Sequence, residues 1–353
     1  MDTLTHILSG ALLARATAPR EKRSGEPTTA QRILVGALAC GFPDIDFVAN
    51  LVSPLTYLVN HRGLTHSLVA LPVWAFFIAW VCARLLRPQR GWRAFIGTAA
   101  MGVGLHIAAD LITTFGTILF SPLTQTRFAW GTTFIIDLWF SGIIIAGLVA
   151  SALRRDSRTP AVAACTVLAA YVLFQALMKN EASSLGHDYA KTQGLKNAEV
   201  SALPRAVSPF NWTVVVSTPE SQHHANINLA QRHMPPEPRP EDGFFARMRA
   251  NFYPPSMARW QLSPRFGFTA AESVLAREAW EQPDFAYYRW FASYPALLFI
   301  DRQGAATCVW FQDLRFANVG VNYTPFRHGM CREQGKPWQR HELLGEGRHS
   351  RFD

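Results

Sequence analysis

The feature that most constrains this chain is a series of long apolar stretches in its first half. A helix needs about 18 or more predominantly apolar residues to cross a bilayer. Four stretches reach that length: 64–83, 94–120, 134–153 and 160–178. Two shorter apolar segments, 4–14 and 33–42, are too short to span and are expected to be re-entrant or bundle-packed helices. The sequence therefore predicts an all-α, membrane-embedded helical bundle with four long spans and two short helices.

The composition of the chain changes near residue 183. Between residues 94 and 153 the ionisable side chains are few: His106, Asp110, Arg127 and Asp137. After residue 183 the chain is rich in charge, Pro and aromatics. Its segments 211–218, 224–230, 295–301 and 306–316 carry the Val, Thr, Ile and aromatic residues typical of strands. The sequence thus predicts two domains: a membrane-embedded helical domain (1–182) and a small, soluble α+β domain (183–353), mostly strand.

Arginine placement predicts the orientation of the bundle. Three loops, 15–32, 84–93 and 154–159, are rich in arginine, whereas the connections between them carry one arginine each. Basic loops stay on the cytoplasmic side, so the N-terminus and everything after residue 180 are expected to face outward. The prediction is a multi-pass protein of the inner (plasma) membrane with an extracytoplasmic C-terminal domain. Because topology explains much of the net charge of +9, no nucleic-acid partner is expected.

Several ionisable residues lie within or beside the apolar segments, where charge is expensive and usually functional. They are His6, Asp44, Asp46, His61, His66, His106, Asp110 and Asp137. His106 and Asp110 are four residues apart and share one helix face. Asp44 and Asp46 follow Pro43, which is expected to end the preceding helix. In the orientation derived from the arginines, all of these residues lie near the outer side of the membrane.

A cluster of neutral imidazoles and carboxylates suits Zn²⁺ or a related divalent ion, and the number of candidates allows one or two ions. Two such ions can activate water and stabilise an in-line displacement at phosphorus. The alternative is a non-enzymatic protein, either a metal or proton transporter with a His-Asp relay or a scaffold. At this level both interpretations stay open.

Four motifs carry a resemblance to a known family. They are TLTH (3–6), PDID (43–46), HRGLTHS (61–67) and HIAAD (106–110). As a set they resemble the YdjM-like family of inner-membrane proteins, regarded as metal-dependent hydrolases. That family is in turn similar to the zinc phospholipase C and P1-type nuclease fold, whose zinc cluster cleaves phosphoesters. The resemblance implies these metal ligands: His6, Asp44 or Asp46, His61 or His66, His106 and Asp110. It also implies that Asp110 bridges two ions, with Asp137 as a later candidate.

The predicted function is that of a phospholipase-like, metal-dependent hydrolase. It would cleave a phosphoester of a lipid or amphiphile with a metal-activated water, so its partners are the bilayer and that substrate. Asp110, Arg62 and Asp46 are the predicted catalytic residues. Arg62 is the candidate that neutralises a phosphate, because a guanidinium matches phosphate oxygens bidentately; an anchor in the loop or at lipid head groups is the other interpretation. The sequence does not set the oligomeric state.

The five cysteines divide between the two predicted domains. Cys40, Cys82 and Cys165 lie in apolar segments and are interpreted as packing residues. Cys308 and Cys331 lie in the C-terminal domain, which the predicted topology exposes to an oxidising compartment. A disulfide between them fits this location, although pairing cannot be deduced from sequence.

Overall fold

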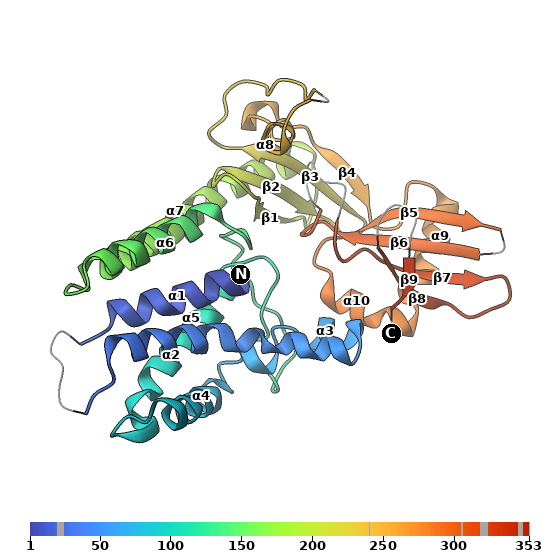
Figure 1. Cartoon of the computed structure of the whole chain (residues 1–353). Coiled ribbons are helices and arrows are strands. Elements are labelled where there is room, and N and C mark those ends of the chain that lie inside the picture. The colour runs from blue at the N-terminus through green and yellow to red at the C-terminus, as the bar shows by residue number, and fades with distance from the viewer. Residues whose placement is uncertain (20–24, 240, 305, 318–323, 345–348, 353) are drawn as a thin grey trace. The chain divides into compact units, whose positions relative to one another are not determined.

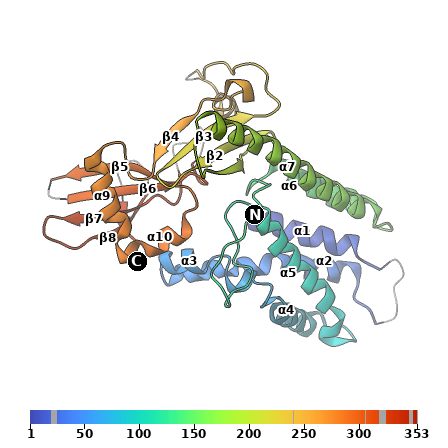
Figure 2. The same cartoon turned by 180° about the vertical axis from the view of Figure 1, so that it is seen from behind.

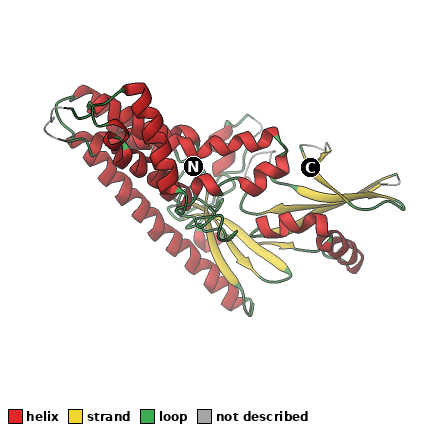
Figure 3. Cartoon of the chain, turned by 90° about the horizontal axis from the view of Figure 1, so that it is seen from below, coloured by secondary structure: helices red, strands yellow, loops and turns green. Residues whose placement is uncertain are grey.

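The computed structural model describes most of the chain. The described residues are 1–19, 25–239, 241–304, 306–317, 324–344 and 349–352. The chain divides into two compact units, Met1–Leu177 (unit 1) and Met178–Asp353 (unit 2). Unit 1 is helical and unit 2 contains the strands, as Figure 3 shows by colour. Unit 1 ends within the long helix α7 (Thr159–Thr192), which also contains the boundary that the sequence predicts between residues 182 and 183.

The helices of unit 1 are joined by short connections except before α2 and between α5 and α6, where a long loop follows α5 (Figures 1 and 2). In chain order they are α1 (Thr3–Ala16), α2 (Thr29–Gly41), η1 (Phe42–Leu51), α3 (Pro54–Asn60), η2 (Leu64–His66), α4 (Leu71–Leu86), η3 (Gly91–Ala94), α5 (Ile96–Leu111), α6 (Leu138–Leu153) and the first part of α7. The elements written η are 3₁₀ helices. Arg20, Lys22 and Arg23 of the first basic loop lie outside the described residues.

Small residues let α1, α2 and α5 pack backbone to backbone. A Cβ placed on Gly10 of α1 would lie 2.2 Å from the carbonyl oxygen of Gly36 in α2. A Cβ on Gly102 of α5 would lie 2.7 Å from the Cβ of Ala39 in α2. Such close approach is typical of helices that associate inside membranes, where small residues replace bulky ones at the interface. The packing brings the polar residues of α1 and α5 close to the end of α2.

The expectation of four long spans is not supported. Among the described residues, two helical segments are long and apolar enough to cross a membrane, Thr29–Leu51 and α7. A third exists only if Pro54–His66 and Leu71–Leu86, which are bent by 80° at their junction, form one span. Helices α5 and α6 have 16 residues each, fewer than the windows that predicted them. The helical character of the first half is confirmed.

Hydrogen bonds to distant segments end these helices early. The Ser67 hydroxyl donates to the carbonyls of Leu119 (3.2 Å) and Ser121 (2.6 Å), so the chain turns before α4. The backbone N–H of Thr132 donates to the carbonyl of Ile112 at 2.8 Å, where α5 has just ended. Pro43 was expected to end the preceding helix, but it lies in the first turn of η1, where proline is tolerated. Helix α2 therefore continues into η1, and the segment that was expected to be short becomes a candidate span.

The described residues of unit 2 form two antiparallel sheets. The first has the order β1 (Glu199–Pro204), β2 (Asn211–Ser217), β3 (Ser221–Asn228) and β4 (Gln261–Pro264). The second has the order β5 (Pro295–Gln303), β6 (Ala306–Asp313), β7 (His328–Glu333), β8 (Gln339–Leu343) and β9 (His349–Arg351). The helices are α8 (Phe244–Arg249), η4 (Pro255–Met257), α9 (Ala270–Glu281), η5 (Pro283–Phe285) and α10 (Ala286–Phe291). The prediction of a strand-rich second half is confirmed.

Candidate metal centre

Polar residues from separate elements of unit 1 meet in one place. His6 of α1, Asp44 of η1, and His106 and Asp110 of α5 each offer a ligand atom, and these atoms lie within 4.8 Å of one another. His66, at the end of η2, joins them, because its Nε2 lies 2.9 Å from His106 Nε2 and 3.3 Å from Asp110 Oδ2. Four of the five side chains are fully buried, whereas Asp44 is partly exposed. These five residues are called the His-Asp cluster below.

The backbone sets the protonation of His106. Its Nδ1 lies 2.6 Å from the carbonyl oxygen of Cys40, which can only accept a hydrogen bond, so Nδ1 carries the proton. In the neutral ring, Nε2 then presents a lone pair. That atom lies 3.5 Å from Asp110 Oδ2 and 3.6 Å from Asp44 Oδ1. A histidine held through one nitrogen by a backbone carbonyl, with the other nitrogen free, is typical of metal ligands.

His66 is oriented in the same way by a carboxylate. Its Nδ1 lies 3.5 Å from Asp46 Oδ2 and 2.9 Å from the hydroxyl of Thr65. Its Nε2 lies only 2.9 Å from His106 Nε2, which presents a lone pair. This approach requires either a proton on His66 Nε2 or a cation between the two nitrogens.

Asp110 contributes an unpaired acceptor to the same space. Its Oδ1 lies 3.1 Å from His6 Nε2 and 2.8 Å from the Arg62 guanidinium, and it also contacts the amino nitrogen of Met1. Its Oδ2 is buried and has no hydrogen-bond partner within the described part of the chain. A buried polar atom without a partner usually marks an absent water or ion. The imidazole nitrogens and carboxylate oxygens of this cluster are therefore groups that can hold a metal ion.

Arg62 reaches the cluster from an unusual backbone conformation. Its φ of 58° is in the left-handed region, which costs about 1 kcal/mol for a residue with a side chain. Its N–H donates to Asp46 Oδ2 at 2.9 Å and its carbonyl accepts from Ile118 at 2.9 Å, so both sides of the residue are held. The buried guanidinium donates to Thr113 Oγ1 at 2.8 Å and pairs with Asp110. The structure thus places this predicted catalytic residue against Asp110.

The motifs PDID and HRGLTHS each contain two candidate ligands, and the structure distinguishes between them. Asp44 and His66 lie in the cluster itself. Asp46 lies behind it and contacts His66, the backbone of Arg62 and His61. His61 contacts both carboxylate oxygens of Asp46 through Nδ1 at 3.1 Å, and no contact joins it directly to the cluster carboxylates among the described interactions. Asp46 is therefore placed to orient ligands.

Asp137 lies outside the cluster and caps a helix. Its Oδ1 accepts from the backbone N–H groups of Trp139 and Phe140 at 2.9 Å, which satisfies the first turn of α6. Its Oδ2 accepts from the Tyr171 hydroxyl at 2.9 Å. An aspartate at this position is a favoured N-cap, so its local role accounts for a carboxylate at the start of an apolar helix.

Sequence reasoning missed three residues that support the cluster. Thr3 donates its hydroxyl to Asp44 Oδ2 at 2.6 Å, and Thr113 accepts from Arg62. Each threonine is three residues from a cluster residue on or next to its helix, a spacing that places side chains on one face and could have indicated them. Cys40, interpreted as a packing residue, provides the carbonyl for His106, and it forms a second group of potential ligands with His6 and His106.

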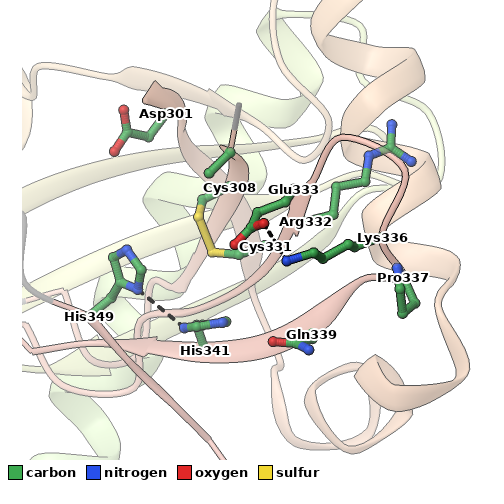
Figure 4. Close-up of a pocket in the computed structure, with 11 residues that line it drawn as sticks. Asp301, Cys308, Cys331, Arg332, Glu333, Lys336, Pro337, Gln339, His341 and His349 are labelled. Carbon is green, nitrogen blue, oxygen red and sulfur yellow. Dashed lines mark hydrogen bonds and ion pairs between the residues drawn. A yellow bond between two sulfur atoms is a disulfide. The ribbon is translucent and has the colours of Figure 1, made fainter. Parts of the chain in front are cut away.

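Unit 2 contains another group of potential ligands, shown in Figure 4. Cys308, Cys331 and His349 have ligand atoms within 4.8 Å of one another. However, the two cysteines lie opposite each other on β6 and β7 and form a disulfide. Disulfide sulfurs are not thiolates, and thiolates are the form that binds zinc. The adjacent histidines, His341 and His349, contact each other through their Nδ1 atoms at 3.2 Å. This pocket is therefore no metal centre in the oxidised protein.

Two other histidines in unit 2, the buried His328 and the partly buried His224, have structural roles. Burial lowers the pKa of His328 to about 3 and that of His224 to about 4, so both rings are neutral near pH 7. His328 lies among the aromatic rings of Tyr287, Tyr288 and Phe352. His224 Nε2 lies 3.1 Å from the Ser263 hydroxyl on the neighbouring strand.

The similarity to a known protein family lies in the first half of the chain. The sequence pattern of the YdjM inner membrane protein family matches residues 1–182, which contain the whole cluster. The chain is similar to "Uncharacterized protein YfhP" of Bacillus subtilis (strain 168), with 29% identity over 174 residues. That match covers 49% of this chain and 51% of the relative, so the similarity extends over about half of each protein. No solved structure matches the chain. The chain belongs to the YdjM family of inner membrane proteins.

Proposed function

We propose that this protein is a membrane-bound, metal-dependent hydrolase that cleaves a phosphoester of a lipid or amphiphile. The observation that carries the proposal is the polar interior of the His-Asp cluster. There His66 Nε2, His106 Nε2 and the buried Oδ2 of Asp110 lie within 3.5 Å of one another. The cluster motifs resemble those of the YdjM-like family, and we take phosphoester chemistry from the similarity of that family to the zinc phospholipase C and P1-type nuclease fold.

Each residue of the cluster has a role in this proposal. His6, His66, His106, Asp44 and Asp110 would hold one or two ions, with zinc best suited to the donor set. When bound, such an ion lowers the pKa of a coordinated water and stabilises negative charge that develops at phosphorus. Arg62 keeps Asp110 in position and adds positive charge beside an anionic substrate. Asp46 keeps the proton of His66 on Nδ1, so that Nε2 stays available.

The proposal includes the topology. We place the protein in the inner membrane as a multi-pass protein, with the basic loops in the cytoplasm and unit 2 outside. Two features support this orientation. The arginines gather in alternate loops, and Cys308 and Cys331 form a disulfide, which persists in oxidising compartments.

Metal content is the direct test of the centre. Full-length protein purified in detergent should contain divalent metal by elemental analysis, and Asp110→Asn should lose it because the bridging carboxylate loses its charge. Asp137→Asn is the matched control, since asparagine is also a good N-cap and residue 137 lies outside the cluster. It should keep the metal.

Hydrolysis is tested on the same preparations with a set of lipid and nucleotide phosphoesters. The wild type and Asp137→Asn should hydrolyse at least one of them, and Asp110→Asn should not. Metal bound equally by all three proteins would disprove the centre. Metal-dependent ion flux into proteoliposomes, without hydrolysis of any phosphoester, would instead support a transporter.

A further inference from the structure

A groove in unit 1 begins at the His-Asp cluster and runs between α1, α2, η1 and α4. It has a volume of about 720 Å³, which is within the range of small-molecule binding sites. One end of the groove is lined by Thr3 and Asp44. From there it follows α2 back to Leu34 and α4 forward to Val81, because these two helices run in opposite directions. Leu34 is seven residues before Gly41, or about 10 Å along the helix.

Asp44 connects the groove to the cluster. Its Oδ2 accepts the Thr3 hydroxyl at 2.6 Å, and its Oδ1 lies 3.6 Å from His106 Nε2 and 3.7 Å from His66 Nε2. It is also the cluster carboxylate with measurable exposure, at 16% of its side chain compared with 0% for Asp110. A ligand that contacts Asp44 can therefore reach the cluster from the groove.

The rest of the groove is apolar. Of its lining residues, Asp44 is the one carboxylate, and none is lysine or arginine. Large apolar side chains such as Leu38 and Phe77, about half exposed at 51% and 45%, form its walls. In water an apolar surface of this kind would be unfavourable, but α2 and η1 belong to a candidate membrane span. The groove thus combines apolar walls, which belong in part to a candidate membrane span, with ionised groups at one end.

The helices that line the groove contact one another at its polar end. A Cβ placed on Gly41 would lie 2.7 Å from Ile7 Cγ1, so glycine allows the end of α2 to touch α1 there. Phe42 packs against the rings of Trp74 and Phe77 on α4, with centroids 5.2 and 6.1 Å apart. These contacts join all three helices next to Asp44.

We propose that the groove binds an acyl chain of the substrate lipid and that the phosphoester of the same molecule lies at Asp44. An amphiphile matches both ends, since an apolar chain is the ligand that long apolar walls accept and an anionic head group can be bound by a metal centre and Arg62. The proposal builds on the hydrolase function above. It adds a substrate class, a lipid with at least one long acyl chain, and a residue set that determines chain length.

The test uses full-length protein in nanodiscs of phosphatidylethanolamine and phosphatidylglycerol that contain a phospholipid with a photoactivatable acyl terminus. Irradiation should attach the lipid to peptides from α2 and α4. Val81→Trp, which fills the deep end of the groove, should abolish that labelling and shift the hydrolysis preference about tenfold toward shorter chains. Val73→Trp is the matched control, because Val73 is also on α4 and exposed but does not line the groove. It should change neither quantity.

A second pair of variants keeps the test valid if Val81→Trp does not fold. Leu38→Trp fills the groove from α2, and Leu85→Trp places the same side chain on an exposed part of α4 away from it. Metal content should be equal in all four variants.

The groove assignment would be overturned if both groove variants kept the labelling and the chain preference of the wild type while metal and hydrolysis stayed intact. The hydrolase function would not be affected by that result. Cross-links between two copies of the protein through the groove, in place of lipid adducts, would also overturn it. Groove labelling that responds as expected in a protein without metal or hydrolysis would support the groove and overturn the hydrolase.

Discussion

At the scale of single residues, the main question is how unit 1 keeps so many polar groups buried. Asp44 and Asp110 each bring a carboxylate to the cluster, and Asp110 contacts both the Arg62 guanidinium and the amino nitrogen of Met1. His106 donates to the Cys40 carbonyl, and its ring stacks on that of His6 at 3.7 Å. A buried carboxylate that loses its cationic partners is strongly unfavourable. A bound divalent cation would coordinate the same carboxylates.

The ion pair of Asp110 with Arg62 predicts a metal-dependent effect of Arg62→Ala. Without metal, the substitution leaves the buried Asp110 carboxylate with the Met1 amino group but without its guanidinium partner, so the free energy of unfolding should fall by about 3 kcal/mol. Zinc should restore much of this loss, because a ligand that binds the folded state stabilises it. Thermal unfolding in detergent, with EDTA and with zinc, measures both effects.

Arg90→Ala is the control for this measurement. Its pair with Glu26 is at the surface, 3.7 Å long, with the arginine 58% exposed, and exposed pairs contribute less than about 1 kcal/mol. Equal stability of Arg62→Ala and the wild type in EDTA would show that Asp110 does not depend on Arg62.

At the scale of elements, glycines position the ligands. Gly10 and Gly36 let α1 and α2 touch, and His6 is one turn before Gly10 on α1. The carbonyl of Cys40, which orients His106, is one turn after Gly36 on α2. The distance between the two helices therefore determines whether ligands from both elements reach the same ion.

Gly10→Ala tests this positioning. Its new methyl group would overlap the Gly36 backbone, so the helices must separate, at a cost of about 1–3 kcal/mol. We expect lower thermal stability together with reduced metal content by elemental analysis. Gly142→Ala in α6 meets nothing within 4 Å and should be neutral or stabilising by about 0.5–1 kcal/mol, since alanine favours helix. A Gly10→Ala protein with full metal content would contradict the positioning role.

At the scale of the whole molecule, the chain joins a helical, membrane-type unit to a strand-rich unit. Each has its own core. Leu12, Ile144 and Ala164 are buried together in unit 1, whereas Trp212, Val214 and Ile227 are buried together in unit 2. The His-Asp cluster draws all of its residues from unit 1, so the metal centre should not depend on covalent features of unit 2.

The disulfide tests this separation. Cys308 and Cys331 are 23 residues apart in the chain, and closing a loop of that size stabilises a domain by about 3 kcal/mol. The double substitution Cys308→Ser with Cys331→Ser should therefore make unit 2 more sensitive to limited proteolysis while metal content stays unchanged. Cys165→Ser, which removes a free thiol from α7, is the control. Loss of metal from the double variant would show that the units are coupled.

The sequence predicted some elements well because their signals are local. The apolar run at 160–178 became the first part of α7, and the strand segments near 211, 224, 295 and 306 became β2, β3, β5 and β6. The windows 64–83, 94–120 and 134–153 predicted longer helices than the structure has. Their ends depend on hydrogen bonds between residues far apart, such as Ser67 with Ser121, which hydropathy does not report.

The membrane character of the first half, the strand-rich second half and the residue types of the candidate centre could be predicted from the sequence alone. Those properties follow from composition and spacing, which act over a few residues. The packing of the helices was needed to show that Asp44 and His66 enter the cluster, that Asp46 contacts His66 from outside it, and that Asp137 caps α6. Which oxygen or nitrogen faces the common space depends on how α1, α2 and α5 pack together, and neighbours in space are not neighbours in sequence.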